Sequence, residues 1–128
     1  MTPGAPGRAI VLFAHGARDP EWAVPFRRIR DALAARLEPG GRVALAFLEL
    51  MDPPLETAVA ELAAAGIGSI VLVPLFMAQG GHLKHDLPRK LAEIGRTHPS
   101  VTFRVLPAVG DVDEVLAAIV DWILRAQT

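Results

Sequence analysis

Four short apolar runs alternate with stretches of helical periodicity along the chain. The runs predict strands over 8–14, 42–48, 70–74 and 102–106, and each is followed by apolar residues at spacings of three and four. Runs that are apolar on both faces are typical of buried parallel strands, and spacings of three and four are typical of one helix face. Four such units predict an α/β fold: a single-domain, four-stranded parallel sheet with helices on both faces.

Residues that interrupt these patterns predict where the third helix begins. Pro74 cannot donate a ladder hydrogen bond, so the strand from Ile70 should end close to it. The residues 79–81 (Gln-Gly-Gly) predict a loop after this strand. Asp86 suits the N-cap and Pro88 the first turn of a helix, so we expect the third helix to start there.

The last helix is predicted to open at Asp111, with Glu114 three residues later as an approximate capping box. Its apolar residues follow helical spacing and predict one buried stripe. The stripe consists of Val115, Leu116, Ile119, Trp122 and Ile123.

The connections between strands predict where a ligand binds. Right-handed crossovers allow the strand order 2-1-3-4, in which strands one and three are neighbours and the chain reverses direction between them. Open α/β sheets bind ligands at such a point, beyond the carboxyl ends of the strands. There the first strand ends at His15, and the third is followed by the segment 80–85, so we expect the two segments to meet.

Composition narrows the possible function classes. A length of 128 residues indicates one domain, expected over 8–128, with residues 1–7 as a flexible leader that lacks the apolar core of a signal peptide. The net charge of −1 gives no indication of nucleic acid or of a membrane surface. The absence of cysteine excludes disulfides and thiolate metal sites. No run is long enough for a membrane span, and we expect a cytoplasmic protein.

Two histidines are the main candidates for chemistry. His15 and His82 each follow an apolar strand beside glycine, and neutral imidazoles commonly ligate divalent cobalt, nickel, iron and zinc. Glu49 ends the second strand on the same edge, where it is a solvated carboxylate, a general base or a metal ligand. His85 either adds another nitrogen or faces water.

Other features near this edge suit an acidic ligand. Arg18 and Lys84 carry positive charge close to the histidines, although most such residues are plain surface. Gly80 and Gly81 leave backbone open to a bound molecule. The chain has no G-x-S-x-G elbow, phosphate-binding loop or dinucleotide glycine fingerprint, which argues against those classes of enzyme.

Three linked motifs follow one another along the chain. They are 13–20 (F-A-H-G-A-R-D-P), 47–49 (F-L-E) followed by Pro54, and 73–76 (V-P-L-F) continuing through 80–82 (G-G-H) to 86–88 (D-L-P). Together they resemble the sirohydrochlorin chelatases, and more narrowly the short, single-domain cobaltochelatases of the class II chelatases. The match runs from about Arg8 to the C-terminus.

The resemblance implies insertion of a divalent metal, Co²⁺ first and Fe²⁺ or Ni²⁺ as alternatives, into the eight-carboxylate tetrapyrrole sirohydrochlorin, on the way to cobalamin, sirohaem or a nickel tetrapyrrole. It implies that His15 and His82 hold the metal and that Glu49 is catalytic. The metal is then substrate, and no organic cofactor is needed. Two positions depart from the family: Ala17 replaces a common serine, and His85 replaces a commonly charged residue.

Two alternatives stay open at this point. A non-catalytic carrier of metal or tetrapyrrole would use the same residues without turnover. The oligomeric state also matters, because one small domain covers only one face of a flat macrocycle. The longer members of the resembled family supply two such domains. Together with an apolar content of 52%, this predicts a homodimer.

Overall fold

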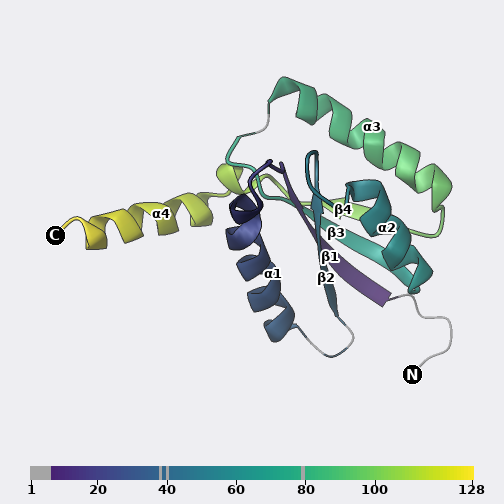
Figure 1. Cartoon of the computed structure of the whole chain (residues 1–128), viewed down its shortest axis with the longest axis horizontal. Helices are drawn as coiled ribbons and strands as arrows, with labels where there is room; N and C mark the ends of the chain where they lie inside the picture. Colours follow the sequence, from purple (N-terminus) through teal and green to yellow (C-terminus); the bar gives the residue numbers. More distant parts are fainter. Residues whose placement is uncertain (1–6, 38, 40, 79) are drawn as a thin grey trace.

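Four parallel strands form one sheet in the order β2–β1–β3–β4 (Figure 1). The computed structural model describes residues 7–37, 39, 41–78 and 80–128. The predicted strand order is confirmed. Of the predicted leader, residues 1–6 lie outside the described residues, and Gly7 already belongs to the first strand. The strands are β1 (Gly7–Ala14), β2 (Arg42–Phe47), β3 (Ile67–Pro74) and β4 (Thr102–Val105).

Helices lie on both faces of this sheet, as predicted: α1 on one face, α2 and α3 on the other (Figure 1). A 3-10 turn, η1, precedes α1, and a second one, η2, precedes α4. Within the described ranges, no helix has the length and apolar character needed to cross a membrane. The bounds are η1 (Pro20–Ala23), α1 (Val24–Arg36), α2 (Leu55–Ala64), α3 (Gly81–Thr97), η2 (Val109–Asp111) and α4 (Asp113–Ala126).

The face under α2 and α3 holds most of the core. Phe13, Ile70 and Leu72 point from the strands into this layer and are almost fully buried. Leu55 and Val59 of α2 close over them, and burial of each such side chain contributes about 1.5–3 kcal/mol. This layer fixes the central strands whose carboxyl ends carry the candidate site.

The opposite face is covered unevenly. α1 packs on β1 and β2, where Leu12 and Leu45 are buried together with Ala23. On β3, by contrast, Val71 and Val73 point to this face and remain half-buried. Within the described residues, no helix therefore lies over the part of this face formed by β3 and β4.

The predicted start of α3 is wrong. The helix begins at Gly81 with Gly80 as N-cap, so Asp86 lies in its second turn and Pro88 in its interior. An interior proline removes one helical hydrogen bond and normally destabilises a helix. Here Leu83 packs against the same core as Leu87, one turn further on, and this burial favours helix on both sides of the proline.

The predicted packing of α4 is also wrong. The helix starts at Asp113 and not at Asp111, which belongs to η2. No side chain caps the start of α4. None of its fourteen residues, all within the described part of the chain, is buried. Figure 1 shows α4 extending away from the sheet. The apolar spacing therefore predicted a helix with one apolar face, but could not specify the surface that buries it.

Candidate functional site

The carboxyl ends of β1 and β2 are held together beyond the regular strands. The backbone N–H of Leu48 donates to the carbonyl of Ala14 at 2.9 Å, and that of Glu49 donates to the carbonyl of His15 at 3.0 Å. Gly16 follows with a φ of 97°, and a Cβ atom there would stand 1.8 Å from the Glu49 carbonyl oxygen. Only glycine fits this approach, so the backbone fixes the spacing of His15 and Glu49.

The side chains of His15 and Glu49 meet beyond the ends of β1 and β2, and we call this pair and its backbone the His15 corner. His15 Nε2 lies 3.3 Å from Glu49 Oε1, and each side chain is 54% exposed. The His15 ring also stands edge-on to Phe76, with ring centroids 6.4 Å apart. An exposed pair of this kind contributes little to stability, about 0–1 kcal/mol. It does place a nitrogen lone pair or a carboxylate where a bound molecule can reach it.

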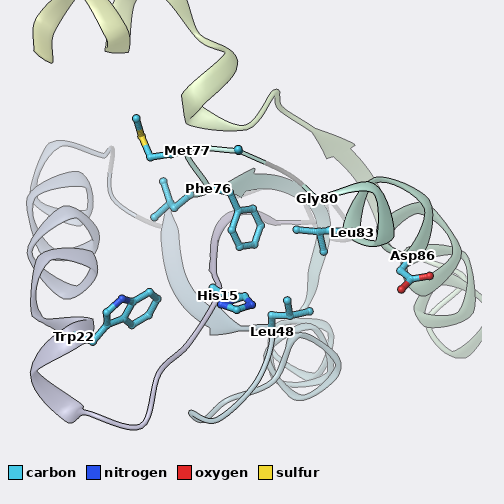
Figure 2. A pocket seen from close by; sticks show the side chains of 10 residues that line it. His15, Trp22, Leu48, Phe76, Met77, Gly80, Leu83 and Asp86 are labelled. Carbon is cyan, nitrogen blue, oxygen red and sulfur yellow. The ribbon is translucent and has the colours of Figure 1, made fainter. Parts of the chain in front are cut away.

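His15 faces a broad pocket of about 590 Å³ (Figure 2). Its volume is within the range of small-molecule sites. The wall is mostly apolar, with Phe76 above His15 and Leu48 and Leu83 on the side of α3. The full lining is His15, Trp22, Leu48, Leu75, Phe76, Met77, Ala78, Gly80, Leu83 and Asp86.

The start of α3 borders the same pocket through Gly80 and Leu83. The segment after β3 therefore lies beside His15, as the strand order predicted, but it is helical and not a loop. His82 is the second residue of α3, and its side chain lies outside what the structure describes. A close approach of His15 and His82 stays a prediction.

The remaining predicted residues lie around the pocket and do not line it. Arg18 is exposed in the turn between His15 and η1. Gly81, Lys84 and His85 are exposed on the first turns of α3. Among the residues that could be searched, no three histidine, aspartate or glutamate side chains lie close enough to hold one metal ion.

Sequence reasoning missed the apolar wall and Asp86, which it treated as a helix cap. Leu48, Leu75 and Phe76 directly follow strand ends, so the rule that ligands bind beyond the carboxyl ends could have identified them. Asp86 instead forms an ion pair with Arg89 on α3. Asp86 lines the pocket because the helix starts at Gly81, five residues before it. A helix that started at Asp86 would not have predicted this position.

One lysine near this edge has a structural role. Lys90 Nζ of α3 lies 2.8 Å from Glu56 Oε1 of α2 and links the two helices. Its hydrogen bond holds the pKa of the Glu56 carboxyl below its ordinary value, although partial burial acts in the opposite direction. This pair therefore lies between helices and not in the pocket.

Comparison with known proteins identifies the family. The model of the CbiX family matches residues 9–126. The chain belongs to the CbiX family. A sirohydrochlorin cobaltochelatase of Sulfurisphaera tokodaii is 31% identical over 126 residues, which cover 93% of this chain and 96% of that protein. One of Methanopyrus kandleri is 37% identical over 87 residues, and the match spans only 57% of its length.

Solved structures of the family have the same fold. A putative cobalamin biosynthesis CbiX protein of Marinobacter aquaeolei VT8 superposes with a TM-score of 0.80 at 30% identity, over 92% of this chain and 95% of that one. The sirohydrochlorin chelatase SirB of Bacillus subtilis subspecies spizizenii, in complex with cobalt, superposes with a TM-score of 0.78 at 25% identity. It is matched over 94% of this chain but only 51% of SirB, so the chain corresponds to half of that protein.

Proposed function

We propose that the chain is a sirohydrochlorin metal chelatase that inserts Co²⁺, with Fe²⁺ or Ni²⁺ as alternatives, into the macrocycle. The observation that carries the proposal is the His15–Glu49 pair, 3.3 Å apart, whose His15 lines a broad apolar pocket. Relatives that match this chain are named sirohydrochlorin cobaltochelatases and, in Bacillus subtilis, a sirohydrochlorin ferrochelatase.

The reaction requires proton acceptors and a place for the incoming ion. Two pyrrole N–H protons leave the macrocycle, the divalent ion takes their place, and two protons pass to bases or water. The neutral His15 imidazole can hold the ion as it loses water, and Glu49 can accept a proton. The metal is a substrate in this scheme, and no organic cofactor takes part.

The surroundings suit a flat, acidic ligand. Phe76, Leu48 and Leu83 offer an apolar surface on which a macrocycle face can lie. Arg18 and Lys84, exposed nearby, can pair with its peripheral carboxylates. We propose His82 as a second metal ligand because it is the second residue of the helix that borders this pocket.

The working unit is proposed to be a homodimer. The pocket is open to solvent, whereas ligand sites usually bury most of the ligand. Since the chain corresponds to half of SirB, a second copy would supply the other half of the site. The domain that acts in this way spans residues 8–128.

Turnover is the property that separates a chelatase from the alternative, a carrier. The test follows the absorbance of sirohydrochlorin with Co²⁺, at macrocycle concentrations well above that of the protein. A chelatase converts many equivalents faster than the protein-free reaction. A spectral change that stops at one equivalent per site would establish a carrier and contradict this proposal.

A further inference from the structure

The turn directly after Glu49 has an unusual backbone conformation. Leu50 has a φ of 65°, and among the described residues it is the one non-glycine residue with a positive φ. The backbone N–H of Met51 donates to the Glu49 carbonyl at 2.8 Å, which closes a γ-turn centred on Leu50. A γ-turn with a positive central φ is rare, and it is strained at a residue that carries a Cβ atom. The surrounding structure must therefore hold Leu50 in this conformation.

Packing of the Leu50 side chain does not explain the strain. The side chain is 59% exposed, belongs to neither group of core residues and does not line the pocket. Glycine or asparagine would adopt a positive φ at lower cost. The conformation at Leu50 is therefore imposed by its neighbours along the chain and not by burial of its own side chain.

The loop that contains this turn is held at its base and on both sides. The backbone N–H of Phe47, the last residue of β2, donates to the Pro53 carbonyl at 2.9 Å. Within the loop, Leu48 packs against the core under α2 and α3, whereas Met51 packs against the core under α1. Only two residues, the first of them Glu49, separate these anchors. The chain therefore passes from one layer to the other in a very short distance, which requires a sharp turn.

The same turn fixes the backbone of Glu49. Its N–H donates to the His15 carbonyl at 3.0 Å, while its carbonyl accepts from Met51 and lies against Gly16. The peptide groups on both sides of the Glu49 Cα atom are thus held, and with them the direction in which the side chain leaves the backbone. The side chain itself is 54% exposed, so little packing holds it 3.3 Å from His15 Nε2. Backbone geometry is what maintains this distance.

We propose that the γ-turn at Leu50 positions Glu49 for its role beside His15. The inference rests on the proposed function, in which Glu49 accepts a proton. Leu50 is a positioning residue that acts only through the Glu49 backbone. A relaxed turn, with a negative φ at Leu50, would rotate the peptide group between the two residues, break the Met51 hydrogen bond and move the carboxylate away from His15. A misplacement of about 1 Å can lower the rate of a reaction about 10²-fold.

Two substitutions at Leu50 that differ in their tolerance of a positive φ test this role. The β-branched side chain in Leu50→Val strongly disfavours a positive φ, whereas Leu50→Asn is a matched variant that also shortens the side chain but tolerates the turn. We expect Leu50→Val to lower kcat for cobalt insertion by about 10-fold to 100-fold with little change in KM, and Leu50→Asn to stay within about twofold of the parental chain. A parental rate in Leu50→Val, or equal losses in the two variants, would overturn the proposal.

A second background separates positioning from general damage. If the turn acts only through Glu49, Leu50→Val should lower the rate of a Glu49→Gln chain by less than about twofold, because residues that act as one unit are not additive. The full loss in this background would overturn the proposal. Circular dichroism establishes that each variant is folded. Should Leu50→Val not fold, Leu50→Ala opposes the positive φ less strongly and is expected to give the same pattern with a smaller loss.

A measurement that needs no turnover tests the turn separately from the proposed function. Nuclear Overhauser contacts between the His15 ring and the Glu49 side chain are expected in the parental chain and in Leu50→Asn, and should be lost in Leu50→Val. Contacts that persist in Leu50→Val would overturn the positioning role whatever the activity. If the contacts change as expected but the parental chain does not turn over sirohydrochlorin, the proposed function fails and the control of Glu49 by the turn stands.

Discussion

The corner at His15 and the helix α4 are both exposed, but they differ in how their surroundings hold them. His15 and Glu49 stand on backbone that is hydrogen-bonded across two strands and closed by Gly16. α4 contacts little more than the turn before it. Exposed polar groups on fixed backbone indicate a site for a small ligand. An exposed apolar helix without packing indicates a missing protein surface.

We expect the largest loss of stability and activity from a substitution at Gly16. In Gly16→Ala a methyl group meets the Glu49 carbonyl at 1.8 Å, in addition to strain from the positive φ of about 1–3 kcal/mol. We expect the free energy of unfolding to fall by about 3 kcal/mol or more and metal insertion to be lost. Urea unfolding and the absorbance assay measure the two effects.

Gly66→Ala is the matched control for this change. Gly66 has a φ of 89°, but nothing lies within 4 Å of a Cβ atom there. Only backbone strain of about 1–2 kcal/mol is expected, with metal insertion retained. Equal losses in the two variants would show that the close approach to Glu49 is unimportant.

The side chains of the corner should affect rate without affecting stability. His15→Ala and Glu49→Gln are each expected to lower the rate of cobalt insertion by about 10²-fold or more, the usual contribution of a positioned acid or base. Stability should change by less than about 1 kcal/mol because the pair is exposed. Glu93→Gln in α3 and His98→Ala directly after this helix are the controls. Parental rates in His15→Ala would contradict the assignment.

A substitution on the apolar side of α4 should weaken the proposed homodimer. Trp122 is 62% exposed in the single chain. Trp122→Glu places a charge among the exposed apolar side chains of α4, and loss of an aromatic anchor from a protein interface commonly costs about 2 kcal/mol or more. We expect the dissociation constant of the proposed homodimer to rise about 30-fold, as measured by light scattering across a dilution series. Ala117→Glu, on the polar side, should leave it unchanged. A dimer equally tight in both variants would show that α4 lies outside the interface.

The smallest effect should come from the Lys90–Glu56 pair, which belongs to neither region. The pKa of Glu56 is lowered in the folded chain, so its stabilisation is present above the unfolded pKa and is lost as pH falls through the folded pKa. Both side chains are partly exposed, so Glu56→Gln should cost less than about 1 kcal/mol near neutral pH, and still less in acid or in high salt. Urea unfolding at the two pH values measures this difference, and an equal cost at both would contradict it.

The sequence predicts features that depend on neighbouring residues along the chain better than features that depend on packing against distant residues or another molecule. The strand order is one that right-handed crossovers allow, and the meeting of His15 with the segment after β3 follows from that order and from where the two strands end. The start of α3 was missed because burial of Leu83 outweighed the proline at Pro88. The exposure of Trp122 was missed because apolar spacing does not say which molecule covers a helix.

The two backbone hydrogen bonds beyond the ends of β1 and β2 have a consequence for insertions and deletions. They join His15 to Glu49 across the sheet, so the distance between these residues does not depend on how long the connecting chain through α1 is. Residues added at the opposite edge of the sheet, between α1 and β2, should therefore leave the corner unchanged. One residue added between Ala14 and Gly16 would move His15 out of register with Glu49 and separate the pair.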